Sequence, residues 1–384
     1  MISNAAKEFE IGPIRPPSEA NSLLLRITRN CPWNKCKFCK LYKKQEFSTR
    51  SFEEIKADID AVASYRNDIS ESMPDGITQN TYRLRQKLTG MPEETAHRYL
   101  YIMQWMADGE ESVFLQDANA MVLAFDKLRP ILMYLREKLP RVKRVTAYGR
   151  VDSLNKFSEE QFKALKEAGL DRIHSGFESG SDKVLSLINK GYTKAQEIES
   201  GQKIKASGIE LSVYYMPGAG GKELSGENAT ETADAVNKIN PDFVRIRTFV
   251  SLPGSGLYED IAAGLITECT DAEKMFELKK MIENIDSADG YMYSDHIINL
   301  FETVRGNMKT DKEKILSVFK IFESLDEQDR RRYQLARRLG MLRSPDELKY
   351  LDAGQREKVE MYLSQLDTEE KFEAFLLKLL RRYV

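Results

Sequence analysis

A repeating alternation of short apolar runs and longer amphipathic stretches most limits what this chain can fold into. Six runs are typical of strands: 23–28, 112–115, 142–147, 172–176, 210–215 and 243–250. From the second run onward they alternate with helical patterns: 121–139, interrupted at Pro130, 158–168, 181–189, 193–206 and 226–239. Such alternation predicts a parallel sheet with helices on its outside. Because six units fall short of a closed eight-fold barrel, we predict an α/β fold, a partial (β/α)6 barrel.

The barrel is expected to span residues 22–258, with segments of different character around it. Residues 1–21 form a lead-in that several prolines keep irregular, and residues 259–384 form a helical C-terminal region. A helical insert at 67–111, with helices at 81–88 and 92–106, follows a helix at 51–66 that opens with a Ser51/Glu54 capping box. The insert is longer than a βα connection needs, so it either walls the site or packs as an appendage.

A cysteine-rich loop directly follows the first strand. It holds three of the chain's four cysteines in C-x4-C-x2-C spacing: Cys31, Cys36 and Cys39. Closed zinc sites take four nitrogen or sulfur ligands, whereas three thiolates suit an iron–sulfur cluster with one iron left open. A structural disulfide, or a zinc site completed by Cys269 or by a histidine, remains an alternative. The histidines are distant in sequence: His97, His174 and His296.

This loop, with Phe38 just before its last thiol, resembles the cysteine loop of the radical S-adenosylmethionine (radical SAM) superfamily. In that family three cysteines hold a [4Fe–4S] cluster, and SAM binds the fourth iron through its amino and carboxylate groups. The resemblance therefore implies Cys31, Cys36 and Cys39 as metal ligands, and a [4Fe–4S] cluster and SAM as cofactors. It extends over residues 23–258 and implies the same partial (β/α)6 barrel. The commonest family spacing is C-x3-C-x2-C, so this loop has one residue more between its first two thiols.

Polar residues follow the second and third strands, at the edge where barrels of this type gather their chemistry. The second strand is followed by Gln116, Asp117 and Asn119, and the third by Tyr148, Arg150 and Asp152. The first set resembles a variant of the GGE-like family motif that contacts the amine of SAM. An Asp/Asn pair that merely forms a turn is the alternative.

The fourth strand leads into GFESGS, which continues to the NKG at 189–191. This stretch resembles the methylthiotransferase- and coproporphyrinogen-oxidase-like branch of the superfamily. The resemblance implies that Glu178 hydrogen-bonds the ribose of SAM and that Lys190 lies near its carboxylate, with Ser179 beside them.

The fifth and sixth strands end in glycines and arginines. The glycines of YYMPGAGGKE match neither common nucleotide-binding motif, and in the family a similar turn shapes the floor near SAM. Arg245 and Arg247 share one face of their strand and either clamp a carboxylate or phosphate, of SAM or of substrate, or form structural ion pairs. The cofactor-binding candidates are Phe38, Gln116, Asp117, Tyr148, Arg150, Glu178, Ser179, Lys190 and Arg247.

Composition bears mainly on location and partners. A formal net charge of −2 gives no general attraction to nucleic acid or anionic membranes. Without a secretory leader or an apolar run long enough to span a bilayer, we expect a cytoplasmic protein. Arginine clusters in the last 84 residues are nearly balanced by acids, so nucleic acid is an unlikely partner. His296, next to Asp295, is either a packing residue or a functional one.

The sequence thus predicts a radical SAM enzyme that cleaves SAM reductively and abstracts hydrogen from a small-molecule or unidentified substrate. The resemblance also implies an electron donor such as flavodoxin or ferredoxin. No catalytic residue of the chain itself is assigned. A second cysteine cluster and a preceding cobalamin-binding domain are not expected. An RNA-modifying radical SAM enzyme and a non-catalytic iron–sulfur or zinc protein remain alternatives.

Overall fold

The computed structural model describes residues 8–73 and 81–383. Residues 1–7 of the expected lead-in and 74–80 of the expected insert lie outside the described residues. The chain divides into two compact units. The first comprises Met1–Pro32, Lys44–His174 and Ala206–Ile209, and the second comprises Trp33–Lys43, Ser175–Lys205 and Glu210–Val384. The cysteine loop therefore contributes Cys31 to the first unit, and Cys36 and Cys39 to the second.

The main sheet has eight strands in the order β1-β4-β5-β6-β7-β8-β9-β10. Their bounds are β1 Leu23–Arg26, β4 Ser112–Gln116, β5 Arg144–Tyr148, β6 Arg172–Glu178, β7 Glu210–Tyr215, β8 Phe243–Ile246, β9 Tyr291–Tyr293 and β10 Arg305–Asn307. β1, β4, β5 and β6 pair in parallel, as do β7, β8 and β9, whereas β10 runs antiparallel to β9. A small second sheet pairs β2 (Thr28–Arg29) with β3 (Ser48–Thr49). The predicted α/β class with a mostly parallel sheet is confirmed.

All six predicted strands are present, and the C-terminal region, predicted to be helical, contains two short strands in addition to its helices. β9 and β10 lie within residues 259–384 and extend the sheet beyond β8. Each has only three residues, which is too short for an alternating pattern to stand out in the sequence. β9 forms because it can pair with β8, with Tyr291 opposite Phe243 and Tyr293 opposite Arg245.

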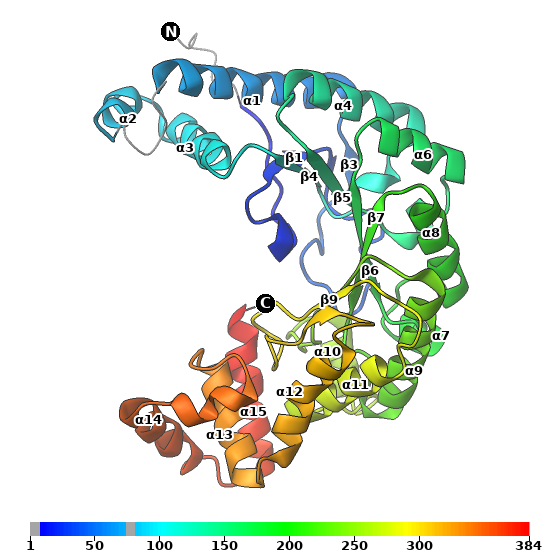
Figure 1. The fold of residues 1–384 in the computed structure, drawn as a ribbon, viewed down its shortest axis with the longest axis vertical. Helices are drawn as coiled ribbons and strands as arrows, with labels where there is room; N and C mark the ends of the chain where they lie inside the picture. The colour runs from blue at the N-terminus through cyan, green and yellow to red at the C-terminus, as the bar shows by residue number, and fades with distance from the viewer. Residues whose placement is uncertain (1–7, 74–80, 384) are drawn as a thin grey trace. The chain divides into compact units, whose positions relative to one another are not determined.

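The helices of the first unit follow the predicted pattern closely. Their bounds are α1 Phe52–Ser72, α2 Thr81–Leu88, α3 Glu93–Ala107, α4 Phe125–Lys138, α5 Val151–Leu154 and α6 Glu159–Glu167. The Ser51/Glu54 box caps α1, which packs against α3 and α4 (Figure 1). The expected interruption at Pro130 lies elsewhere: a 3₁₀ turn at Ala120–Val122 precedes α4, and α4 runs through Pro130.

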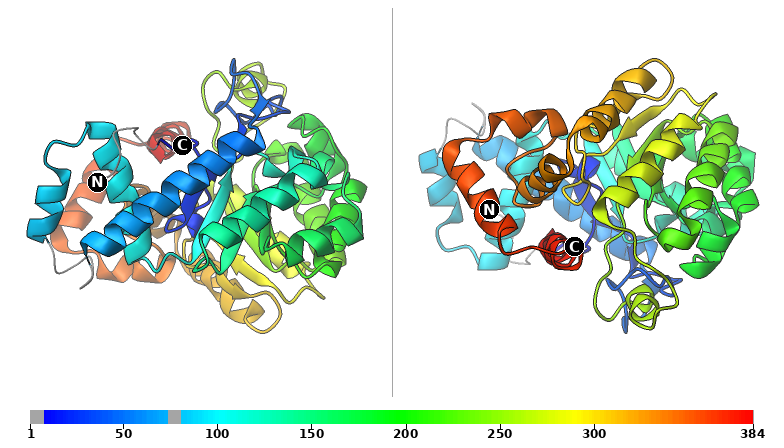
Figure 2. Two further views of the ribbon diagram at one scale, coloured as in Figure 1. Left: turned by 90° about the horizontal axis from the view of Figure 1, so that it is seen from above. Right: turned by 90° about the horizontal axis from the view of Figure 1, so that it is seen from below.

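The second unit contains the remaining helices. Their bounds are α7 Asp182–Leu187, α8 Lys194–Ala206, α9 Gly221–Ile239, α10 Gly256–Ala262, α11 Asp271–Glu283, α12 Lys312–Ser324, α13 Glu327–Arg338, α14 Ala353–Leu363 and α15 Glu369–Leu380. α9 and α11 pack on each other, and α13 packs on α14 and α15 (orange to red in Figure 2). Within the part of the chain that the structure describes, no helix has both the length and the apolar character needed to cross a membrane.

Gly180, just after β6, allows a close approach to α9. A Cβ atom at this position would lie 2.5 Å from the carbonyl oxygen of Glu231 and 2.7 Å from the Cα of Thr232. The Gly180 N–H also donates to Oγ1 of Thr232 at 2.8 Å. The obstructing atoms belong to helix backbone, which cannot move aside as a flexible side chain could.

Gly180→Ala is therefore expected to lower the free energy of unfolding by about 2–3 kcal/mol, because α9 must shift away from β6. Urea denaturation followed by circular dichroism measures this change. The matched control is Gly226→Ala, inside α9, where the added Cβ meets only the amine end of Lys280, at 3.2 Å. The control is expected to be neutral or to stabilise by up to about 1 kcal/mol. Equal stabilities for the two variants would contradict the close-approach argument.

Candidate functional site

In the second unit, the cysteine loop is anchored by hydrogen bonds at both of its sides. The indole N–H of Trp33 donates to the carbonyl of Asn189 at 2.8 Å. The backbone N–H of Lys37 donates to the carbonyl of Ile188, and its carbonyl accepts from the N–H of Leu257, both at 2.9 Å. The segment that carries Cys36 and Cys39 is thereby fixed against the end of α7 and the start of α10.

The NKG at 189–191 is the main docking point for this loop. The side-chain amide of Asn189 donates to the carbonyl of Lys35 at 3.2 Å. Gly191 has a positive φ of +79°, and any Cβ there would overlap the Trp33 ring. Sequence reasoning assigned only Lys190 a role. The positioning roles of Asn189 and Gly191 required the fold, because their partners lie more than 150 residues away in sequence.

Phe38 has a packing role in the second unit. Its ring lies against an apolar cluster formed by Val184, Ile188, Met216, Ala219, Phe249, Leu257 and Ile266. The amine of Lys190 lies 5.6 Å from the centre of the Phe38 ring, within cation–π range. Phe38 thus ties the loop to the core and to Lys190, and its predicted contact with a cofactor stays a prediction.

The four cysteines are all reduced, so the structure gives no support to the disulfide alternative. Cys36 is buried, whereas Cys31 and Cys39 are half-buried. Among residues 8–73 and 81–383, no three His, Cys, Asp or Glu side chains are already arranged as a metal site. The ligand set Cys31, Cys36 and Cys39 therefore stays a prediction from spacing and thiol chemistry. Burial raises the pKa of Cys269 to about 12, which disfavours the thiolate that a metal needs.

The loop is rich in lysine, which suits an anionic group held by thiolates. Five lysines lie between residues 35 and 44: Lys35, Lys37, Lys40, Lys43 and Lys44. The amine of Lys43 donates to the carbonyls of Asn34, at 2.8 Å, and Cys36, at 3.3 Å. Reduced thiols are the donor set that an iron–sulfur cluster requires, and the positive charge of the loop suits the anionic group that they would hold.

Glu178 and Lys190 form a buried pair beside this loop. The amine of Lys190 lies 3.5 Å from Oε1 of Glu178, and both side chains are at most one-tenth exposed. Glu178 ends β6 with a left-handed φ of +69°, a conformation that costs a non-glycine residue free energy. Its Oε2 is buried without a hydrogen-bond donor among the described residues. A residue with a strained backbone and a carboxylate oxygen that accepts no hydrogen bond is expected where a ligand hydroxyl binds.

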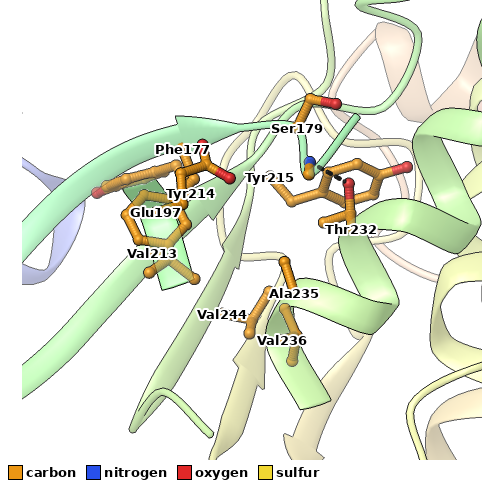
Figure 3. Close-up of a pocket in the computed structure, with 11 residues that line it drawn as sticks. Phe177, Ser179, Glu197, Val213, Tyr214, Tyr215, Thr232, Ala235, Val236 and Val244 are labelled. Carbon is orange, nitrogen blue, oxygen red and sulfur yellow. Dashed lines mark hydrogen bonds between the residues drawn. The ribbon is translucent and has the colours of Figure 1, made fainter. Parts of the chain in front are cut away.

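Ser179 lies in the wall of a small cavity behind β6. The hydroxyl of Ser179 accepts from the N–H of Ser181 at 2.9 Å, so its oxygen is already engaged. The cavity has about 10 Å³, room for one water molecule, and Glu197 of α8 lines it next to Phe177 and Tyr214 (Figure 3). Burial raises the pKa of Glu197 well above its usual range, which disfavours the charged form of this carboxyl group.

In the first unit, Asp117 organises the residues that lead into Cys31. Its Oδ2 accepts from Nη2 of Arg26, at 2.7 Å, and from the backbone N–H of Asn30, at 3.2 Å. The Gln116 amide instead holds the N-terminal segment, accepting from the N–H of Gly12 at 2.7 Å and donating to the carbonyls of Gly12 and Ile14. The predicted contacts of Gln116 and Asp117 with SAM stay predictions.

Tyr148 and Arg150 lie at and after the end of β5. The Tyr148 ring lies 5.1 Å from that of Phe114 and 6.0 Å from that of His174, centre to centre. The backbone N–H of Arg150 donates to Asn119 at 3.0 Å, and its guanidinium pairs with Asp152 at 3.0 Å. Asn119 and Asp152 therefore support Arg150 in the structure.

Arg245, Arg247 and His296 lie in the second unit, at and beyond the end of β8 and after β9. Arg245 is paired with Asp295, whereas no side-chain partner of Arg247 is found among the described residues. Burial, reinforced by the positive charge of Arg247, lowers the pKa of His296 to about 4. His296 is therefore neutral at physiological pH.

The pKa of His296 predicts a dependence of stability on pH. Between about pH 6.5 and 4 the unfolded chain binds a proton at His296 that the folded chain does not bind. As far as His296 is concerned, the free energy of unfolding is therefore highest above pH 6.5 and decreases as the pH falls towards 4. His296→Gln lacks this loss of stability. Its free energy of unfolding relative to wild type is therefore expected to be higher at pH 5 than at pH 7, by on the order of 1–2 kcal/mol. Urea denaturation at the two pH values measures this difference.

Glu373 supplies the opposite case as a control. Burial raises its pKa to about 7, so the folded chain holds a proton that the unfolded chain releases between about pH 4.5 and 7. The stabilisation of the folded chain by protonated Glu373 is complete below pH 4.5 and is lost as the pH rises through 7. Glu373→Gln should therefore change the pH dependence in the opposite sense to His296→Gln. If both substitutions changed the pH dependence of stability in the same sense, the opposite pKa shifts assigned to His296 and Glu373 would be wrong.

Comparison with known proteins identifies the central part of the chain. Residues 80–228 match the family model of the radical SAM superfamily. The matched segment takes in β4 to β7, including Glu178 and Lys190. The cysteine loop lies ahead of it.

Individual relatives are more distant. The chain is 30% identical over 114 residues to an uncharacterized methyltransferase of Pyrococcus horikoshii, which is 30% of this chain and 24% of that protein. It is 24% identical over 183 residues to the tRNA-2-methylthio-N(6)-dimethylallyladenosine synthase of Aquifex aeolicus, 46% of this chain and 41% of that protein. The chain thus matches less than half the length of these curated relatives. Coproporphyrinogen III oxidase from Escherichia coli aligns with 78% of this chain and 58% of its own, at 14% identity and a TM-score of 0.45.

Proposed function

Because the chain belongs to the radical SAM superfamily, whose cofactors are a [4Fe–4S] cluster and SAM, we propose that it is an enzyme that cleaves SAM reductively. When bound and reduced by one electron from a donor, the cluster and SAM would supply methionine and a 5′-deoxyadenosyl radical, the species that would abstract a hydrogen atom from the substrate. The protein binds and orients these groups and keeps water away from them. The substrate, and hence the reaction class, is a separate question.

The three loop cysteines would hold the cluster. Cys31, Cys36 and Cys39 form no disulfide and have suitable spacing, and three thiolates leave one of four iron atoms without a protein ligand. The backbone contacts of Lys37 and the docking of Trp33 on Asn189 fix the shape of the loop before any cofactor binds. This preorganisation reduces the ordering cost of cofactor binding.

The observation that carries the proposal is the free acceptor of Glu178. Its buried Oε2 needs a hydrogen-bond donor, and a ribose hydroxyl of SAM is a donor of the right kind. Lys190, which pairs with Oε1 of Glu178 and lies over the Phe38 ring, offers a positive charge for the carboxylate of SAM. Gly176 contributes by lacking a side chain, since a Cβ there would overlap the Glu178 carboxylate.

The test is anaerobic. The protein is reconstituted with iron and sulfide, reduced with dithionite and given SAM, and 5′-deoxyadenosine and methionine are quantified by chromatography. We expect both products in equal amounts, at a rate that depends on the reductant. A cluster-free protein that retains zinc instead would support the non-catalytic alternative and overturn the proposal. Flavodoxin or ferredoxin in place of dithionite tests the proposed electron donor.

A second candidate function is favoured by one specific observation. A relative with a curated name, the enzyme from Aquifex aeolicus, is named as a tRNA-modifying synthase. If this chain also acts on RNA, tRNA should be retained by the protein at moderate salt, with an affinity that falls steeply as salt rises. Absence of retention at low salt would leave the small-molecule substrate as the working hypothesis.

A further inference from the structure

One face of the second unit's sheet is polar and rich in arginine. Side chains alternate along β7, β8 and β9, and Val213 and Val244 take the face that packs on Ala235 and Val236 of α9 (Figure 3). The opposite face, here called the arginine face, presents the intervening strand residues Ser212, Phe243, Arg245, Tyr291 and Tyr293, with Arg247 and Asp295 just beyond the strand ends. Arg247 belongs to this set because its backbone N–H continues the ladder by donating to the carbonyl of Tyr215 at 2.9 Å.

Arg245 is the fixed member of the arginine face. It is only 5% exposed, and its guanidinium lies 5.8 Å from the centre of the Phe243 ring and 5.2 Å from that of Tyr293. Its Nε donates to Ser212 at 3.2 Å, and its Nη1 lies 3.2 Å from Asp295. Because 43% of the Asp295 side chain is exposed, this carboxylate neutralises the buried cation only in part.

Arg247 is the free member. It is half-buried, and its guanidinium has no hydrogen bond, ion pair or ring contact with any residue in the described ranges. Five N–H donors on a half-buried guanidinium are unusual without an acceptor, since planar donors of this kind favour carboxylates and phosphates. The arginine face thus carries two guanidinium groups and one carboxylate, a surplus of positive charge.

His296 adds a directed donor next to Arg247. Its Nδ1 accepts the backbone N–H of Ile298 at 3.3 Å, which assigns the proton of the neutral ring to Nε2. Asp295 and Arg247 are the charged groups that act on this ring, and no partner of Nε2 is found in the part of the chain that the structure describes. An uncharged histidine with an N–H to donate therefore lies within electrostatic reach of the Arg247 guanidinium.

We propose that Arg247 and His296, on the same face as Arg245, bind an oxyanion of the substrate, either a carboxylate or a phosphate. The inference rests on the proposed function and specifies its substrate class. The substrate is a molecule that carries an anionic group, and this group binds at the arginine face. A cationic substrate is disfavoured by the surplus positive charge. The carboxylate of SAM has the same chemistry, so the test must separate the two sources.

The test follows His296 directly. The chain has three histidines, and protein labelled with ¹³C in histidine and loaded with its cluster gives three resolved ring signals, of which His296→Gln identifies one. In wild type, inorganic phosphate is expected to raise the His296 pKa by about one unit or more, since the anion offsets the charge of Arg247 and accepts the Nε2–H. SAM is expected to leave this pKa unchanged.

Three variants at two positions complete the experiment. Arg247→Gln is expected to abolish the phosphate-induced shift and to weaken phosphate binding at least about tenfold. Arg247→Lys, which keeps the charge, should retain part of the shift. Arg382→Gln, at an exposed arginine with no side-chain partner among the described residues, should match wild type.

Three results would overturn the inference: no shift with phosphate in wild type, a shift that persists in Arg247→Gln, or a shift produced by SAM and lost in Arg247→Gln. The third would assign the site to the carboxylate of SAM. Formation of 5′-deoxyadenosine by the same wild-type preparation tells whether the proposed function stands independently. Cleavage of SAM without phosphate binding overturns only the substrate class, and phosphate binding without SAM cleavage overturns only the proposed function.

Discussion

Cys36→Ala is expected to lose its iron. After anaerobic reconstitution, wild type should hold about four iron atoms per chain, and this variant fewer than about one. The reason is that three thiolates are the smallest protein ligand set for such a cluster, and a cluster held by two is exposed to loss and oxidation. SAM cleavage should fall at least about a hundredfold with the iron. Cys31→Ala and Cys39→Ala should behave alike. Iron and sulfide assays and the visible absorption spectrum measure the effect.

Cys269→Ala is the matched control, because it removes the one cysteine outside the loop. Cys269 is 3% exposed, and its thiol is held protonated. Its loss creates a small cavity that costs on the order of 1 kcal/mol in stability, but iron content and SAM cleavage should stay at wild-type levels. If Cys269→Ala lost its iron while Cys31→Ala kept it, the assignment of the three ligands would be wrong.

Glu178→Gln is expected to weaken SAM binding by about 10- to 100-fold, the effect of losing a charged acceptor in a buried hydrogen bond. The substitution keeps the size of the side chain but removes the carboxylate that pairs with Lys190 and whose Oε2 is unused in the structure. Equilibrium binding of SAM to the cluster-loaded protein, by isothermal titration calorimetry, measures the change.

Glu197→Gln provides a control of the same chemistry a short distance away. Burial raises the pKa of Glu197 and so disfavours its charged form, and glutamine has nearly the same volume, so the replacement disturbs the site little. SAM affinity should therefore stay within about twofold of wild type. Equal losses in the two variants would show that general disturbance of the β6–α8 region, rather than the Glu178 carboxylate, determines SAM affinity.

The sequence alone predicted the elements whose signals are local. Strand β7 and helix α2 have the expected bounds, and the predicted Ser51/Glu54 box caps α1. Each of these depends on residues within a few positions of one another. The mostly parallel sheet followed from the alternation of such elements.

Features that depend on distant partners could not be predicted. β9 exists because β8 offers it an edge, and Asn189 is important because Trp33 needs a hydrogen-bond acceptor. The Gln116 side chain, predicted to contact SAM, also holds Gly12 and Ile14 of the N-terminal segment, and only the fold brings these partners close. For Arg247 the converse holds, since only the structure reveals that its guanidinium has no partner among the described residues.

The most direct test of the central claim is a Mössbauer spectrum of ⁵⁷Fe-reconstituted protein, recorded with and without SAM. The account predicts a [4Fe–4S] cluster in which the one iron without a cysteine ligand changes its Mössbauer parameters when SAM is added. At a SAM concentration that saturates only the wild type, Glu178→Gln should show no such change. A spectrum without a four-iron cluster, from protein that retains zinc at the cysteine loop, would contradict it.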